Sequence, residues 1–216
     1  MSSLLEISCP VSIIETDIEN QIISGYSVNS SSLTETQDTL HTSLLTNKSR
    51  LQEIYDLRLA VWEHSGKSEF VNRKLFPNGW YDELDEVAFH WITTNDQNKI
   101  IASARLNIFQ SFSEFPYYSN MKHLSFPNTK PFAFYSRLVV HPEYRNNGLS
   151  RQLFDGRTAF CKEKEITWSQ VFINNPYIIA LFEKSGYRSI GHAKVNYHSS
   201  SQPHSVNVFI KESNYG

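Results

Sequence analysis

Cysteine is nearly absent from this sequence, glycine is scarce, and no long hydrophobic run occurs. Of the 216 residues, 2 are cysteines and 8 are glycines. Cys9 and Cys161 match no metal-binding or redox spacing, so we expect two free thiols in a reducing cytoplasm. No apolar run is long enough to cross a bilayer, and the N-terminus lacks the basic start of a secretory signal. We therefore expect neither a membrane protein nor a secreted one.

Basic residues are also missing from the first part of the chain. The first of them is Lys48, whereas residues 1–47 contain six acidic residues. The rest of the chain has four more basic than acidic residues and no basic stripe, which does not indicate nucleic-acid binding. Residues 24–38 are rich in Ser and Thr and predict a flexible segment. We expect a partly flexible, acidic extension at 1–38 and one globular domain at 39–216.

Hydrophobic periodicity predicts alternating strands and helices in the domain. Apolar runs rich in β-branched and aromatic residues indicate strands, and apolar spacings of three and four indicate helices. The expected strands are 39–46, 87–94, 100–109, 132–140, 168–174, 187–197 and 206–211, and the expected helices are 50–64, 148–164 and 176–185. A long aromatic loop is expected at 110–131. This order predicts an α/β (α+β) fold, with a mixed central β-sheet and helices on both faces.

The most informative segment is residues 138–150. A strand ends before Pro142, and a helix begins near residue 148 after the sequence Arg-Asn-Asn-Gly-Leu-Ser. Backbone N–H groups at a helix start carry partial positive charge and suit a pyrophosphate. Gly148 would let the backbone approach such a ligand closely, and Arg145 would add a positive charge. The turn has neither the three glycines of the dinucleotide fingerprint nor the Gly-Lys-Ser/Thr of nucleoside-triphosphate loops.

This segment resembles motif A of the GNAT N-acetyltransferase superfamily, Arg/Gln-x-x-Gly-x-Gly/Ala. Arg145, Gly148 and Ser150 fall on the three positions, and Ser150 departs from Gly/Ala but is equally small. Residues 175–187 are similar to a second family signature, Asn-x-x-Ala-x-x-Leu-Tyr-Glu-Lys-x-Gly-Phe. Two motifs in the family's order make the resemblance specific. It covers the chain from about residue 40 to residue 212.

The resemblance implies a GNAT fold that binds acetyl-CoA as co-substrate between two splayed central strands, here 132–140 and 168–174. The backbone of Leu138 and Val140 would bind the pantetheine arm, and the N–H of Val139 would stabilise charge on the thioester oxygen. The turn would hold the pyrophosphate, and for Asn175 a helix cap is the alternative role. The residues expected at the donor are Leu138, Val139, Val140, Arg145, Asn146, Asn147, Gly148, Leu149, Ser150, Asn174, Asn175 and Phe182.

The implied reaction is direct attack of a neutral primary amine on the thioester in a ternary complex. The amine must first lose a proton, and the leaving thiolate can receive one. The family's usual proton donor is the Tyr of Leu-Tyr-Glu-Lys, but here that position is Phe182. The candidate catalytic groups are therefore His90 as base, Tyr187 or Tyr177 as proton donor to the thiolate, and the N–H of Val139. Tyr135 is a further candidate and could instead hydrogen-bond to His90. The alternatives are that these side chains only pack or hydrogen-bond, and that the thiolate leaves unaided.

The N-terminal half of the domain resembles the ElaA-type branch of the superfamily, through Leu57-Arg58-x-x-Val61-Trp62, Asp82-x-x-Asp85, His90 and Ala104-Arg105-Leu106, and Pro203-His204 fits the same branch. Its charged residues, together with one on the central strand, form a set: Arg58, Asp82, Asp85, Arg105 and Arg137. Two interpretations stay open, a buried ion-pair network and a grip on an acceptor carboxylate. The same set resembles AHL (acyl-homoserine-lactone) synthases and N-acyl amino acid synthases, which use acyl carrier protein. Those enzymes carry Glu three residues before the strand arginine, where this chain has Phe134.

We predict a cytoplasmic N-acetyltransferase that acts on the amine of a small molecule. No metal, nucleic-acid or membrane partner is expected, and a homodimer is left open. His192, His198 and His204 are evenly spaced, but strand phase and a Ser-rich turn separate them, which does not favour a metal site. Two alternatives remain. One is an acyltransferase that uses acyl carrier protein, and the other is a non-catalytic CoA sensor, which the absence of the family's tyrosine at Phe182 would fit.

Overall fold

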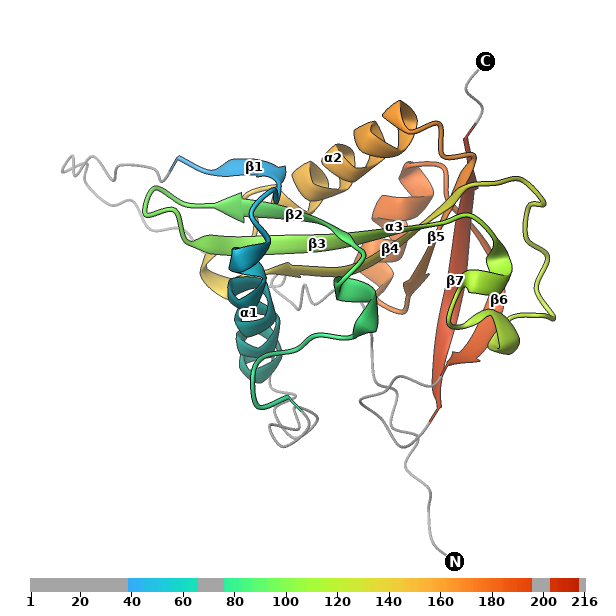
Figure 1. Ribbon diagram of the computed structural model, residues 1–216, viewed down its shortest axis with the longest axis horizontal. Helices are drawn as coiled ribbons and strands as arrows, with labels where there is room; N and C mark the ends of the chain where they lie inside the picture. Colours follow the sequence, from blue (N-terminus) through green and yellow to red (C-terminus); the bar gives the residue numbers. More distant parts are fainter. Residues whose placement is uncertain (1–38, 66–75, 196–202, 214–216) are drawn as a thin grey trace, which may run out of the picture.

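The computed structural model describes residues 39–65, 76–195 and 203–213. The expected extension at 1–38 and His198 lie outside these residues. Within the described part, seven strands form one sheet in the order β1-β2-β3-β4-β5-β7-β6 (Figure 1). β4 and β5 run parallel, and the other described neighbours are antiparallel. The mixed sheet of the expected fold is confirmed.

All the expected strands and helices are present, with ends that shift by a few residues. The expected strand at 187–197, for example, runs from residue 188 to residue 195. The strands are β1 (His41–Leu44), β2 (Phe89–Thr94), β3 (Ile100–Phe109), β4 (Phe132–Val140), β5 (Trp168–Ile173), β6 (Arg188–Val195) and β7 (His204–Glu212). The helices are α1 (Leu51–His64), α2 (Leu149–Glu163) and α3 (Pro176–Lys184).

Helices cover both faces of the sheet, with α1 on one side and α2 and α3 on the other (Figure 1). Ile54, Val61 and Trp62 of α1 pack with Ile92 and Val139 on the α1 face. On the opposite face, the side of α2 that meets the sheet repeats every four residues and is buried throughout. Its members are Leu149, Leu153, Arg157 and Cys161. Because both faces of β4 are covered, each residue of that strand is buried.

The expected loop at 110–131 contains two short 3₁₀ turns, η4 (Phe112–Glu114) and η5 (Tyr118–Asn120). Its aromatic side chains join those of the central strands in a second buried cluster. The cluster includes Phe109, Phe115, Phe132, Phe134, Trp168 and Phe172. Phe132 and Trp168 stack at 4.4 Å between ring centroids, where β4 and β5 are paired. The loop therefore packs the paired ends of the two central strands.

One helical glycine is required by packing. A Cβ at Gly156 in α2 would lie 2.8 Å from the indole Nε1 of Trp91 in β2. In an exposed helix, Gly to Ala stabilises by about 1 kcal/mol, because alanine loses less backbone entropy. At Gly156 this gain is outweighed by a clash with a large, buried ring.

We therefore expect Gly156→Ala to lower the free energy of unfolding by about 1–3 kcal/mol. Urea titration followed by far-UV circular dichroism measures this change. Lys162→Ala is the control, since Lys162 lies on the exposed side of the same helix. A Gly156→Ala variant as stable as the parent would show that Trp91 does not limit the approach of α2 to the sheet.

Candidate functional site

The two parallel strands at the centre of the sheet are paired over only part of their length. Pairing begins at Phe132 with Trp168 and ends at Tyr135 with Val171. β4 continues for five residues and β5 for two, without pairing to each other. We call this opening the fork. It leaves backbone groups of β4 without a strand partner on that side, and buried backbone groups require partners.

A bulge in β4 lies at the start of the fork. Ser103 and Arg105 of β3 oppose Val139 and Ser136 of β4, so two residues of β4 occupy the space opposite one residue of β3. One of the two is Arg137, whose φ of 54° is left-handed. Such a backbone is costly for a side chain of this size, and bulges bend a strand and redirect its side chains. The bulge thus turns β4 away from β5.

The register also determines which backbone groups face the fork. The N–H of His141 donates to the carbonyl of Ile101 at 2.8 Å. Backbone groups alternate in direction along a strand, so Val139, two residues earlier, directs its N–H and C=O toward β3. Val140 therefore directs its N–H and C=O toward the fork. By the same alternation, Leu138, which lies next to the bulge, also directs its N–H and C=O toward the fork. A donor to a ligand in the fork would therefore come from Leu138 or Val140 instead of Val139.

The turn after β4 is shaped by two residues with left-handed backbones. Asn146 has φ 64° and Gly148 has φ 70°. Asn147 holds the turn by donating from Nδ2 to the carbonyls of Tyr144 and Arg145, at 3.2 and 3.3 Å. A Cβ added at Gly148 would meet no atom within 4 Å. The space in front of Gly148 is therefore open, as a ligand that approaches the backbone requires.

The helices α2 and α3 differ at their first residues. At α3, the Asn175 side chain accepts a hydrogen bond from the N–H of Tyr177 at 2.9 Å, and Pro176 follows. At α2 the corresponding residue is Gly148, which has no side chain to cap the helix. Leu149 and Ser150 form the first turn of α2, whose N–H groups point out of the helix. The start of α2 is suited to an anion and the start of α3 is not.

The side chains of Asn174 and Asn175 are both engaged within the protein. The Oδ1 of Asn174 accepts from the N–H of Asn207 at 3.0 Å, and its Nδ2 donates to the carbonyl of Ser205 at 2.9 Å. These bonds fasten the end of β5 to β7. Asn175 caps α3, as described above. The structure thus gives both residues structural contacts beside the fork.

Phe182 lies in a buried aromatic group on the α2 and α3 side of the sheet. Its ring is 4.8 Å from Tyr187, 5.0 Å from Phe154 and 6.4 Å from Tyr135. The phenol of Tyr187 is 2.6 Å from Ser169 Oγ, and that of Tyr135 donates to Cys161 Sγ at 3.5 Å. Burial raises the pKa of Tyr135 and of Tyr187, so both phenols stay protonated at neutral pH.

An ion-pair network lies on the α1 face. Asp82 and Asp85 begin and end a reciprocal capping box around η3 (Glu83–Asp85). The network joins Arg58 to Asp85 at 3.0 Å, Arg105 to Asp82 and to Asp85, and Arg137 to Asp82 at 2.5 Å. Burial alone would raise the pKa of Asp82, but the charges of Arg137 and Arg105 outweigh it and hold that pKa far below its usual value. The network that the sequence left open is present.

His90 belongs to this network. Its Nε2 is 3.2 Å from the carbonyl oxygen of Asp85, and the side chain is 4% exposed. Burial and the charge of Arg58 lower the pKa of His90 to about 4, so the imidazole is neutral at pH 7. β2 is separated from β4 by β3, which places the His90 backbone about 10 Å from that of β4. His90 is therefore a weak base, and its contact with the Asp85 carbonyl gives it a structural role.

Sequence reasoning missed two residues that contact candidate site groups. The guanidinium of Arg137 lies 4.3 Å from the ring centroid of Trp80, a cation–π arrangement that no spacing in the sequence reveals. Arg157 is buried in α2 and lies 4.7 Å from the ring of Tyr135. A signal for Arg157 existed, because it continues the four-residue spacing of Leu149 and Leu153 on the buried side of α2.

The described residues contain neither a metal-binding cluster nor a helix that could span a membrane. Across 39–65, 76–195 and 203–213, no group of three or more His, Cys, Asp or Glu side chains could hold a metal ion. No helix in those same ranges combines the length and apolar character needed to cross a membrane.

Comparison with solved structures finds the same fold in several proteins. FeeM, an N-acyl amino acid synthase from uncultured soil microbes, superposes with a TM-score of 0.57 and 11% identity, covering 82% of this chain and 92% of that one. The AHL synthase LasI gives a TM-score of 0.57 and 10% identity, covering 81% and 90%. An acetyltransferase of the GNAT family from Staphylococcus aureus gives 0.52 and 16%, covering 80% and 99%. At these identities the likeness shows the fold alone.

Comparison of sequences identifies the family. No protein with a curated description matches this chain significantly, and the ElaA-type branch stays a prediction. The model of the Acetyltransferase (GNAT) family matches residues 51–187. This match exceeds half of the chain and contains both strands of the fork, the turn at Gly148 and Phe182. The chain therefore belongs to the GNAT acetyltransferase family.

Proposed function

We propose that the protein transfers an acetyl group from acetyl-CoA to the primary amine of a small molecule. The observation that carries this proposal is the fork, which leads directly into the open turn at Gly148. The diphosphate would bind the backbone of the turn and the first residues of α2, including Leu149 and Ser150. The pantetheine amides would pair with the open edge of β4 at Leu138 and Val140.

The base of the fork favours a short acyl group. Phe172 is the first β5 residue beyond the last pair, and its ring is 4.9 Å from Phe134 and 6.0 Å from Phe115. On the opposite face, Tyr135 and Tyr187 lie 6.2 Å apart. A long acyl chain would have to displace these rings, and displacing packed aromatic side chains is costly. An acetyl donor is thus favoured over the long-chain donors that acyl carrier protein delivers.

The chain's own groups suit a direct transfer. As the amine attacks, negative charge develops on the thioester oxygen, and an N–H of the β4 edge, from Leu138 or Val140, would stabilise it. Removing one such donor typically costs about 10²–10³ in rate. The amine would lose its proton to solvent or to a group within reach, and a His90 pKa of about 4 makes that residue a poor acceptor.

The leaving thiolate has no tyrosine at position 182. Tyr187, whose ring is 4.8 Å from Phe182, is the nearest protonated phenol, but it is hydrogen-bonded to Ser169. A thiol with a pKa of about 8.5 is also an acceptable leaving group without a proton donor. Phe182 equally supports a second candidate function, a CoA-binding sensor without turnover. Acetyl transfer to amines in the presence of the pure protein separates the two.

The first prediction concerns the turn. We expect Gly148→Glu to weaken acetyl-CoA binding by at least about 100-fold, because a carboxylate would occupy the open space and repel the diphosphate. Isothermal calorimetry measures the affinity. Gly186→Glu is a matched control, since Gly186 also has a positive φ (88°) and lies after the end of α3. Undiminished affinity in the Gly148 variant, with the control unchanged, would contradict the proposed diphosphate site.

The second prediction concerns acyl length. We expect the parent to prefer acetyl-CoA over hexanoyl-CoA, and Phe172→Leu to reduce that preference by roughly tenfold, because each buried CH₂ contributes about 0.8 kcal/mol once space exists. The ratio of the two kcat/KM values is measured. Phe126→Leu, in the same cluster but against Trp168 and Phe112, should leave the ratio unchanged. Equal preference in both variants would remove Phe172 as the limit on chain length.

A further inference from the structure

The buried ion-pair network is not electrically balanced. Among residues 39–65, 76–195 and 203–213, it contains the guanidinium groups of Arg58, Arg105 and Arg137 and only two carboxylates, those of Asp82 and Asp85. His90 is neutral at pH 7, so it supplies no charge. The sum is one positive charge in excess among groups that are mostly inaccessible to water. A buried charge without a counter-charge is unfavourable, so the network as it stands can accept one anion.

Unused hydrogen-bond donors accompany the excess charge. The side chain of Arg137 is 7% exposed, and its Nη1 is buried and has no hydrogen-bond partner in the part of the chain that the structure describes. Its Nη2 donates to Asp82 at 2.5 Å, which fixes the orientation of the guanidinium. Trp80 lies against the guanidinium at 4.3 Å and limits its movement. Arg137 is therefore held in one position with a donor left for an acceptor oxygen.

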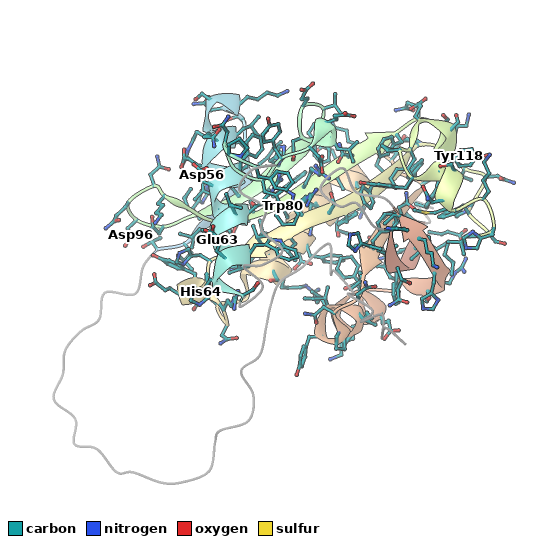
Figure 2. All side chains as sticks on the ribbon, turned by 90° about the horizontal axis from the view of Figure 1, so that it is seen from below. Asp56, Glu63, His64, Trp80, Asp96 and Tyr118 are labelled. Atoms are coloured by element: carbon teal, nitrogen blue, oxygen red, sulfur yellow. The ribbon has the colours of Figure 1, made fainter. Side chains whose placement is uncertain are left out.

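The residue that carries the unused donor lies at the start of the fork. Arg137 directly follows Ser136, the first β4 residue of the fork, and is part of the bulge that opens it. On the same side, Tyr117 lies 5.6 Å from Phe172 at the base of the fork. Trp80 and Tyr117 are partly exposed, and the Asp82 side chain is 13% exposed, so solvent reaches the edge of the cluster. Figure 2 shows Trp80 beside α1 on this side of the sheet.

We propose that Arg137 binds a carboxylate of the acceptor, and that the acceptor is an α-amino acid. This inference depends on the proposed function, because it assumes that the acyl carbon lies at the base of the fork. A carboxylate on Nη1 would balance the network and satisfy the buried donor. Because Arg137 directly follows the first β4 residue of the fork, we expect the amine of an α-amino acid bound there to lie nearer the thioester than the amine of a longer amino acid.

The reaction balances without a further reagent. The neutral α-amine attacks the thioester carbon, a C–N bond forms, and the C–S bond breaks. The sulfur departs with the electron pair of the C–S bond, and the proton lost by the amine is transferred to solvent or to the thiolate. The products are an N-acetyl amino acid and the free thiol of the coenzyme. Arg137 takes no part in bond formation and serves to bind and orient the acceptor.

The decisive test compares each amino acid with two relatives that lack its carboxylate. Acetyl transfer from acetyl-CoA is measured for the twenty amino acids, their carboxamides and their decarboxylated amines, with the full chain. We expect at least one amino acid to react, with a kcat/KM on the order of 10- to 100-fold above that of its carboxamide and of its amine. Equal or better use of the uncharged relatives, or no reaction with any amino acid, overturns the proposal.

A variant separates recognition from folding. Arg137→Lys keeps the charge but loses the planar fork, so we expect KM for the amino acid to rise about tenfold or more while kcat and the affinity for acetyl-CoA change little. Arg188→Gln is the control, because Arg188 pairs with Glu212 on the exposed surface. If Arg137→Lys reduces turnover of the amino acid and its carboxamide equally, the role is structural and the proposal fails.

Failure of the proposed function would look different. In that case acetyl-CoA would not bind in calorimetry, or would bind without acetyl transfer to any amine in the panel. Binding and transfer that ignore the carboxylate would instead leave the proposed function intact and overturn only the role of Arg137.

Discussion

The separation of β4 from β5 after a short stretch of pairing is the constraint on which the site depends. Up to Tyr135 and Val171 the two strands are paired through their backbone N–H and C=O groups. Beyond that point the backbone edge of β4 has no partner in β5, although it lies inside the protein. An unsatisfied edge of this kind is costly unless a ligand or water pairs with it. The bulge at Arg137 starts the separation, and the aromatic rings of Phe134 and Phe172 close its base.

The ion-pair network and the fork form one unit because Arg137 belongs to both. Its left-handed backbone is part of the bulge, and its guanidinium is held by Asp82 and Trp80. A strained backbone persists when its surroundings fix it, and here Asp82 and Trp80 hold the side chain of the strained residue. Asp82 also forms the capping box of η3 with Asp85, so one carboxylate both shapes the segment before β2 and holds Arg137 of the bulge.

The sequence predicted much of this arrangement because local signals agreed with the fold. Val139, Val140 and their neighbours form a continuous apolar strand, and Asn175, Pro176 and Gly186 delimit a helix, so both elements could be placed to within a few residues. The charged residues of the network were also identified, since three arginines on predicted helices and strands need acidic partners, and Asp82 and Asp85 were available in the intervening segment.

The remaining features could not be derived from the sequence because they depend on register. A bulge shifts the direction of every backbone group beyond it, and Arg137 gives no local sign of a left-handed backbone. In this register the N–H groups of Leu138 and Val140, instead of that of Val139, face the fork. The contact between Trp80 and Arg137 joins residues far apart in the chain, and the charge imbalance becomes apparent only when all members of the network are seen together.

The absence of a side-chain cap at Gly148 also has a consequence for the stability of the folded protein. A ligand that binds only the folded chain adds to its stability, by about 2.7 kcal/mol at a hundredfold excess over the dissociation constant. A donor bound at the start of α2 would supply the anion that no side chain of Gly148 provides. The folded chain would then resist unfolding, and the proteolysis that follows unfolding, better with the donor bound than without it.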